Sequence, residues 1–309
     1  QQEGVGEKAT IVPIIGDMTD KDYTDYIIKN TKCNVIFHCA AYKHVPLMEE
    51  NPVAAIHNNV FGTKNLLDAS IKNKVQRFVL ISTDKAVSPV SVYGVSKMYC
   101  EKLILDAAQK ADKNQKFMFV RFANVLGSRG SILPLFMEQI KNGGPVTVTT
   151  ENMSRYFMTI PEACSLVLQT GGMGKNGESY LLDMGESIKI KDLAEQIIKF
   201  SGLEPYKDID IKIIGKRKGE RENEPLWDKS EKPEKTEFPK ILKLKNSPYD
   251  RERLKKLLQN LTQVCFLSKE NENYFRNTKI LLKILCEDVN SLKEFYQQET
   301  SEKSTEINF

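Results

Sequence analysis

The sequence lacks several features that would mark whole classes of protein. No apolar run approaches the roughly 20 residues that a membrane-spanning helix needs, so we expect no membrane segment in this chain. The 309 residues include only three histidines, and none is spaced with a cysteine or a second histidine as metal ligands usually are. The six cysteines show no CxxC spacing, so they are expected to be reduced thiols. We predict no metal site and no disulfide framework.

The charged residues exclude a class of partner. The 45 basic and 41 acidic residues leave a formal net charge of +4, and they form no basic stripe interleaved with aromatic side chains. We therefore expect no nucleic-acid partner. With 40% hydrophobic residues, the chain is long enough to bury the core of one large or two modest domains.

Short β-branched and aromatic runs alternate with helical patterns, which is typical of a parallel sheet wrapped by helices. Strands are predicted at residues 11–15, 35–38, 77–81, 117–121, 146–149 and 209–214, and helices at 52–72, 93–111, 132–141, 161–169 and 191–200. We expect an α/β fold, a Rossmann-like doubly wound parallel sheet with a smaller C-terminal substrate lobe. The expected domains are a partial Rossmann domain at 1–128, a substrate-binding lobe at 129–248, and a helical extension with a polar tail at 249–309.

The strongest chemical signal is the stretch ISTDKAVSPVSVYGVSK, in which a predicted strand ends in Thr83, Asp84 and Lys85 and a helix begins with Tyr93 and Lys97. In an open α/β sheet, ligands bind beyond the carboxyl ends of the strands. Tyr93 and Lys97 are four residues apart and share a helix face, so the ammonium can stabilise a phenolate that acts as a general base. Alone, such a pair is a common surface feature, and Asp84 with Lys85 also suits a turn that carries a solvated ion pair.

Other segments make this stretch specific. They are HCAAYKHVPLMEENP, NNVFGTKNLL, VRFANVLGSRGSILPLF, GGPVTVT, SRYFMTIPEACSLVLQ, YLLDMG and IIGKRKGE. Together with STDKAV and YGVSK, they resemble the UDP-N-acetylglucosamine 4,6-dehydratases of the CapD-like polysaccharide biosynthesis family, within the extended short-chain dehydrogenase/reductases. The resemblance extends from about Ile11 to Lys245. It implies a lyase that uses NAD to convert UDP-N-acetylglucosamine into a UDP-4-keto-6-deoxy-N-acetylhexosamine for bacterial glycan biosynthesis.

The resemblance also implies a role for each residue of the stretch. Tyr93 would take the proton of the sugar's C4 hydroxyl while hydride passes to the nicotinamide, and Lys97 would hold the nicotinamide ribose and lower the pKa of Tyr93. Lys85 would remove the C5 proton, and Asp84 would protonate the departing C6 hydroxyl. Thr83 would hydrogen-bond the sugar near C4. Dehydratases that act on dTDP-glucose carry an acidic residue in place of Lys85, so this pair favours a UDP-N-acetylhexosamine.

Further positions are carried over from the family. The expected cofactor contacts are Asp17, Met18, Ala40 and Ala41 together with Tyr93 and Lys97, and the expected substrate contacts are Asn124, Arg129, Arg155, Arg217 and Glu220. Arginine suits a diphosphate because its planar fork donates two hydrogen bonds at once. Asn59 would support the active site from its helix, with a purely structural hydrogen bond as an equal alternative. For Asp17 the alternative is an ordinary loop carboxylate, and for Ala40 and Ala41 it is helix–sheet packing. For the substrate residues the alternative is surface charge.

The family begins with a strand and a glycine-rich turn that cradle the cofactor's pyrophosphate, and we do not find this unit in the sequence. The chain contains one GxGxxG, at residues 172–177, but it follows a predicted helix and precedes a strand, so we expect a loop there. The choice between NAD and NADP depends on a second strand that this sequence does not contain. Lys218 stands where the family usually has proline.

These features leave two alternatives to a dehydratase. The first is a UDP-hexosamine 4-epimerase, which shares Tyr93 and Lys97 but needs no acid and base for elimination. The second is a truncated, non-catalytic chain that binds nucleotide sugars. We expect a cytoplasmic protein whose parent could be anchored at the inner membrane by a missing N-terminal region. The resemblance further implies a homo-oligomer that pairs through helices like those beginning at Pro52 and Tyr93.

Overall fold

A computed structural model describes residues 9–128, 130–245 and 249–306, with side chains up to residue 299. The described residues form a six-stranded sheet in the order β1-β2-β3-β8-β12-β11. The strands are β1 (Val35–His38), β2 (Arg77–Thr83), β3 (Lys116–Phe122), β8 (Ser179–Leu182), β12 (Ile241–Lys245) and β11 (Lys232–Lys235). The first four are parallel, and β12 and β11 add antiparallel strands at one edge. This Rossmann-like sheet confirms the predicted fold class.

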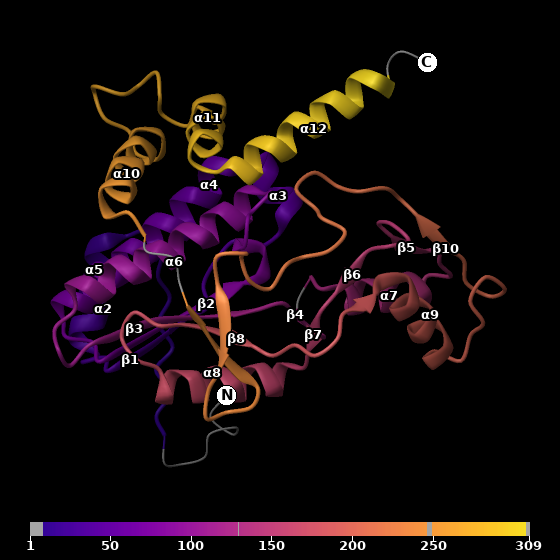
Figure 1. Ribbon diagram of the computed structural model, residues 1–309, viewed down its shortest axis with the longest axis horizontal. Coiled ribbons are helices and arrows are strands. Elements are labelled where there is room, and N and C mark those ends of the chain that lie inside the picture. Colours follow the sequence, from indigo (N-terminus) through magenta and orange to yellow (C-terminus); the bar gives the residue numbers. More distant parts are fainter. Residues whose placement is uncertain (1–8, 129, 246–248, 307–309) are drawn as a thin grey trace.

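Helices cover both faces of the sheet, as the buried centres of β2 and β3 require. On one side lie α2 (Lys21–Asn30), α5 (Gly62–Lys72) and α6 (Val92–Lys110), and on the other lies α8 (Ile160–Met173), as Figure 1 shows. The helix predicted at 52–72 is a continuous run of α4 (Pro52–Ile56), a π-helical segment η1 (His57–Phe61) and α5. The short helix α3 (Val45–Glu50) precedes it.

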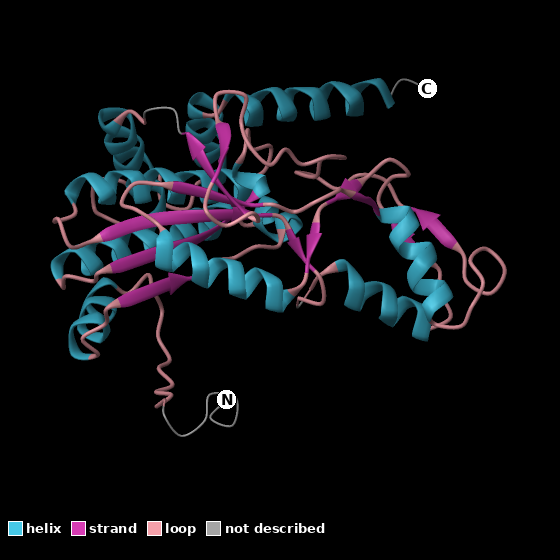
Figure 2. Cartoon of the chain, turned by 60° about the horizontal axis from the view of Figure 1, so that its bottom comes forward, coloured by secondary structure: helices cyan, strands magenta, loops and turns pink. Residues whose placement is uncertain are grey.

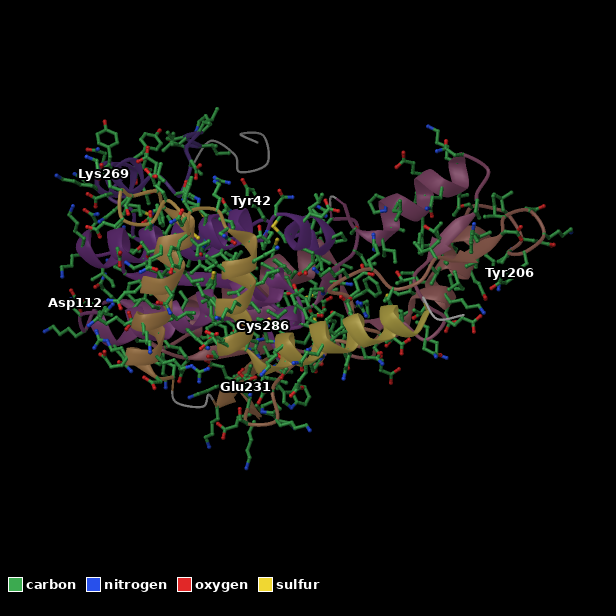
Figure 3. All side chains as sticks on the ribbon, turned by 90° about the horizontal axis from the view of Figure 1, so that it is seen from above. Tyr42, Asp112, Tyr206, Glu231, Lys269 and Cys286 are labelled. Carbon is green, nitrogen blue, oxygen red and sulfur yellow. The ribbon has the colours of Figure 1, made fainter. Side chains whose placement is uncertain are left out.

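A smaller lobe follows β3. It consists of α7 (Ile132–Lys141), β5 (Val146–Val148), α9 (Ile190–Phe200) and β10 (Ile211–Ile213), packed around a core that includes Phe136 and Ile198. The short pairs β4 (Asn124–Val125) with β7 (Phe157–Met158), and β6 (Ser154–Arg155) with β9 (Ile188–Lys189), connect the lobe to the sheet. Figure 3 shows Tyr206 at the far end of this lobe. The segment 129–248, which we expected to form one substrate-binding lobe, is therefore divided between the small lobe and the main sheet, because β8, β11 and β12 join the main sheet.

The C-terminal extension packs back onto the first layer of helices. It comprises α10 (Arg251–Cys265), α11 (Thr278–Asp288) and α12 (Asn290–Glu306). Helices α10 and α11 contact α4, and α12 contacts α11 and projects beyond this layer (Figure 3). Leu261 and Leu285 are completely buried there, and Tyr99 of α6 donates a 3.0 Å hydrogen bond to Asp288. The C-terminal extension therefore covers part of α4 and α6, the helices that we expected to contact a second copy of the chain. Helix α12 also extends into the segment expected as a polar tail.

The strand predicted at residues 11–15 is absent, and that prediction is wrong. The segment has irregular backbone, Ile15 is 96% exposed, and the chain runs away from the sheet (Figure 2). In the usual doubly wound order the third strand pairs with the second, and the described chain offers no such neighbour. In the same order the fourth strand pairs with the first, which the described chain does not provide either, so β1 is the edge of the described sheet and its Phe37 is 38% exposed.

Two other sequence features are placed by the structure. Of the GxGxxG segment, Gly172 and Met173 end α8, and the residues from Gly174 to Gly177 form the turn that leads into β8. Within the described part of the chain, no helix is both long and apolar enough to cross a membrane.

Candidate active site

A cleft of about 530 Å³ opens at the carboxyl ends of β2 and β3, where the sheet meets the small lobe. This volume lies within the range of roughly 300–1,000 Å³ that small-molecule sites occupy. Many of the predicted site residues line it: Ala41, Thr83, Lys85, Tyr93, Lys97, Asn124, Arg155, Arg217 and Glu220. The tertiary structure thus brings together residues that are up to 179 positions apart, from Ala41 to Glu220.

The turn after β2 holds the Asp84–Lys85 pair. Thr83 ends the strand, and residues Asp84–Ala86 form one 3₁₀ turn in which the amide of Lys85 donates to the Thr83 hydroxyl. Oδ1 of Asp84 accepts hydrogen bonds from the Thr83 hydroxyl at 2.9 Å and from Nζ of Lys85 at 3.0 Å. Lys85 Nζ also lies 3.5 Å from Oδ1 of Asn124. Asp84 is fully buried behind the cleft, whereas the Lys85 side chain is 20% exposed and faces it.

Helix α6 presents Tyr93 and Lys97 to the same cleft. Its N-cap is Ser91, whose hydroxyl accepts a 3.1 Å hydrogen bond from the amide of Gly94. Burial, reinforced by the Asp84 carboxylate, raises the pKa of Tyr93, while its hydrogen bond with Thr83 opposes this shift. Burial also lowers the pKa of Lys97. The expected lowering of the pKa of Tyr93 is therefore not found in the protein alone, because desolvation disfavours the phenolate.

Gly94 lets α6 begin directly beside the Asp84–Lys85 turn. A Cβ at this position would lie 2.2 Å from the carbonyl oxygen of Lys85 and 2.9 Å from Cβ of Pro89. Only glycine therefore permits this approach of the two backbones, which sets the distance between Lys85 and Tyr93.

Asn59 lies in the π-helical segment η1 and is 1% exposed. Its amide exchanges hydrogen bonds with the backbone of Tyr42 at 2.8 and 3.0 Å, and it donates a third to the hydroxyl of Ser96 at 2.9 Å. Tyr42, labelled in Figure 3, belongs to the loop after β1, and Ser96 precedes Lys97. Asn59 thus fixes the loop at the cleft to the helix that carries Tyr93. π-helical segments are often found at functional sites.

The predicted substrate residues differ in their surroundings. Arg217 and Glu220 form an ion pair of 2.8 Å at the mouth of the cleft. Arg155 is 8% exposed, and its guanidinium donates to the carbonyl oxygens of Ser154, Arg221 and Glu222, so it supports the loop that follows β10. Arg129 lies outside the described residues.

Glu224 is a site residue that sequence reasoning missed. It lines the cleft, is 8% exposed, and lies 4.0 Å from both Arg155 and Arg221. Burial raises the pKa of Glu224, and the nearby Asp84 acts in the same direction. It stands in the charged run GKRKGERENE, where alternating charges are typical of a solvated loop, so only the fold distinguishes this glutamate from its neighbours.

The predicted cofactor residues fall into two groups. Tyr93, Lys97 and Ala41 line the cleft, and these residues fit the nicotinamide end of a dinucleotide. Asp17 and Met18 lie outside it: Asp17 is exposed and bonds Thr19, and Met18 packs on Gly62. Ala40 is exposed beside the cleft without lining it. No cluster of three or more metal-ligating side chains occurs among the residues that the structure describes.

A Rossmann-like sheet with a Tyr–Lys pair one turn apart on the helix after β2 is the arrangement of a short-chain dehydrogenase/reductase. The model of the polysaccharide biosynthesis protein family matches residues 1–246. The chain belongs to this family.

Individual relatives agree with this assignment. The chain is 43% identical over 276 residues to the capsular polysaccharide biosynthesis protein CapD of Staphylococcus aureus, a match that covers 89% of this chain and 44% of that protein. It is 38% identical to a UDP-glucose 4-epimerase of Rickettsia canadensis, over 69% of this chain and 60% of the epimerase. The solved structure of Pen from Bacillus thuringiensis superposes with a TM-score of 0.70 and 33% identity, covering 84% of this chain and 85% of Pen. The matched region thus spans about half the length of the two curated relatives.

Proposed function

We propose that the cleft is the site of a nucleotide-sugar 4,6-dehydratase, which converts UDP-N-acetylglucosamine into a UDP-4-keto-6-deoxy-N-acetylhexosamine with NAD as its cofactor. The observation that carries the proposal is the buried Asp84 with Lys85 in contact, next to the cleft that Tyr93 lines. A dehydratase needs a base at C4 and a separate acid and base for the elimination, and these three side chains supply that set.

The first step uses α6. Tyr93 takes the proton of the C4 hydroxyl as the C4 hydrogen leaves as hydride, for which bound NAD supplies the acceptor. Because burial raises the pKa of Tyr93, this proton transfer needs a positive charge near the phenol. Lys97, one turn further along the helix, is the side chain of this chain placed to supply it and to hold the nicotinamide ribose.

The second step uses the turn after β2. The C4 ketone acidifies C5. Once the proton of the Lys85 ammonium has passed to Asp84 across their hydrogen bond, Lys85 Nζ can remove the C5 proton, and Asp84 can give its proton to the C6 hydroxyl, which departs as water. Hydride returns to C6 while Lys85 returns a proton to C5, and the proton that Tyr93 took from the C4 hydroxyl then restores Lys85. Arg217 and Glu220 at the mouth of the cleft are the proposed contacts of the nucleotide.

A product analysis tests the proposal. The chain is incubated with NAD and UDP-N-acetylglucosamine, with Tyr93→Phe as the inactive control, and the nucleotide sugars are analysed by mass spectrometry and chromatography. Loss of one water from the sugar nucleotide is the result we expect. A product of unchanged mass and altered retention would instead establish a 4-epimerase, the activity named for the Rickettsia relative. Binding of UDP-N-acetylglucosamine without turnover would establish a non-catalytic binding chain.

A further inference from the structure

Glu49 is a buried carboxylate outside the proposed reaction, and it contacts several separate parts of the chain. It lies near the end of α3 and is 7% exposed. Oε1 accepts a 2.7 Å hydrogen bond from the backbone amide of Val92, the first residue of α6. Oε2 accepts the hydroxyl of Tyr296 in α12 and lies 3.7 Å from Nζ of Lys218.

We infer that Glu49 is a positioning residue. It holds the loop around Lys218 and helix α12 against the first turn of α6, and it thereby aligns the proposed nucleotide contacts with Tyr93. Glu49, Val92, Lys218 and Tyr296 are called the Glu49 cluster below. The part of this inference that concerns nucleotide binding rests on the proposed function.

The contact with α6 follows from the physics of helix ends. The first amides of a helix have no partner within it, and the N-terminus carries partial positive charge. Ser91 caps the amide of Gly94, and Glu49 accepts the amide of Val92 while adding a negative charge at the same end. Glu49 therefore fixes the residue immediately before Tyr93.

The contact with the loop involves Lys218 and Gly219. The ammonium of Lys218 pairs with Glu49 and also lies 4.7 Å from the centre of the Tyr296 ring. Gly219 has a φ of +78°, and a Cβ there would lie 3.0 Å from both Ser91 and Val45. The loop is thus packed against α3 and the start of α6, next to Arg217 and Glu220 at the cleft. Lys218, which stands where proline is usual in the family, has a specific partner in this chain.

The contact with α12 adds the C-terminal extension to the site. Tyr296 donates to Glu49, and burial together with the Glu49 carboxylate raises the pKa of Tyr296, so the phenol keeps its proton. Ser291 of the same helix donates a 2.7 Å hydrogen bond to the carbonyl of Pro89, just before α6. Helix α12 is therefore joined both to the Glu49 cluster and to the segment that leads into the Tyr93 helix.

The experiment compares Glu49→Gln, Tyr296→Phe and Lys218→Met with Glu50→Gln, a control at the exposed neighbouring position. Hydrogen exchange of the 309-residue chain is measured at residues 215–220, together with the urea midpoint of each variant. We expect exchange at residues 215–220 to be about fivefold to tenfold faster in the three variants, because each loses one hydrogen bond or ion pair. Glu50→Gln should exchange as the wild type does. Unchanged exchange in all three variants would overturn the inference, whether or not the chain binds a nucleotide.

A second measurement follows UDP by calorimetry. We expect Tyr296→Phe and Glu49→Gln to weaken UDP binding about fivefold to tenfold in buffer where the urea curve of each variant shows it fully folded, with a double variant no weaker than Glu49→Gln alone. Independent effects that multiply in the double variant, or UDP affinities equal to that of the wild type, would overturn the positioning role. A wild-type chain that does not bind UDP would contradict the proposed function, and the exchange data would still decide the inference.

Discussion

The Lys85 ammonium lies 3.0 Å from Oδ1 of Asp84, while Oδ2 of the same buried carboxylate has no hydrogen-bond partner in the described part of the chain. A buried acceptor without a partner costs about 1–3 kcal/mol of stability. The pair therefore lowers the free energy of unfolding, and the proposed function gives Oδ2 a partner in the hydroxyl of a bound substrate.

Replacing Asp84 with asparagine should separate chemistry from folding. We expect dehydration to fall by at least about 100-fold, because the amide cannot act as an acid, while the free energy of unfolding stays within about 1 kcal/mol of the wild type. The water-loss assay and urea unfolding measure the two effects. Asp68→Asn is the matched control, since Asp68 pairs with Lys64 on an exposed helix surface and should have no effect on turnover. Full dehydration by Asp84→Asn would remove Asp84 from the mechanism.

Two glycine substitutions test the close approach of α6 to the Lys85 turn. Gly94→Ala should lower the free energy of unfolding by about 1–3 kcal/mol and abolish dehydration, because its Cβ would lie 2.2 Å from the Lys85 carbonyl. Gly172→Ala, where no atom lies within 4 Å in helix α8, should instead raise stability by up to about 1 kcal/mol. Thermal unfolding of both variants measures these changes. Equal stability of the two variants would show that the close approach at Gly94 is not required.

His38 should make the protein acid-sensitive. Burial lowers the pKa of His38 to about 3, and its Nε2 lies 2.8 Å from the hydroxyl of Thr63. An unfolded histidine titrates near 6.5, so the unfolded state binds more protons between that pH and about 3, and stability falls as the pH falls through this range. The full loss would be roughly 5 kcal/mol.

Urea unfolding at pH 7, 5 and 4 measures this acid sensitivity. His38→Gln should flatten the difference between these pH values, whereas His44→Gln, at an exposed position, should keep the wild-type difference. If both variants lose stability with acid as the wild type does, other groups dominate the acid response.

The C-terminal helices should behave as part of the core. Leu261 of α10 is completely buried, so Leu261→Ala should cost about 2–5 kcal/mol of unfolding free energy. Leu267, which is 64% exposed just after the same helix, should tolerate alanine within about 0.5 kcal/mol. A single urea transition for the wild type would fit one cooperative unit, while an unchanged midpoint in Leu261→Ala would show that α10 is not docked in solution.

Local patterns were sufficient for most of the regular structure. The strand at 77–81 and the helix at 93–111 were placed within two residues of β2 and α6, because hydrophobic periodicity reports which face of an element is buried. The Tyr93–Lys97 spacing on a helix likewise guarantees a shared face. The order of the motifs was enough to indicate the family to which the chain belongs.

The surroundings of the site were decided by tertiary structure. Residues 11–15 have a strand-like composition, but a strand needs a neighbour, and the described chain provides none. Arg155 has the chemistry of a diphosphate ligand, yet its donors bond the backbone of a loop 66 and 67 residues away.

The sequence by itself determined most of the elements, the family and the proposed catalytic set of Asp84, Lys85, Tyr93 and Lys97, since each depends on residues only a few positions apart. Tertiary structure alone decided the direction of the pKa shift of Tyr93, the burial of Glu49 and Glu224, and the cover over α4 and α6. Desolvation and hydrogen-bond partners depend on which distant segments meet in space, and local spacing carries no information about that.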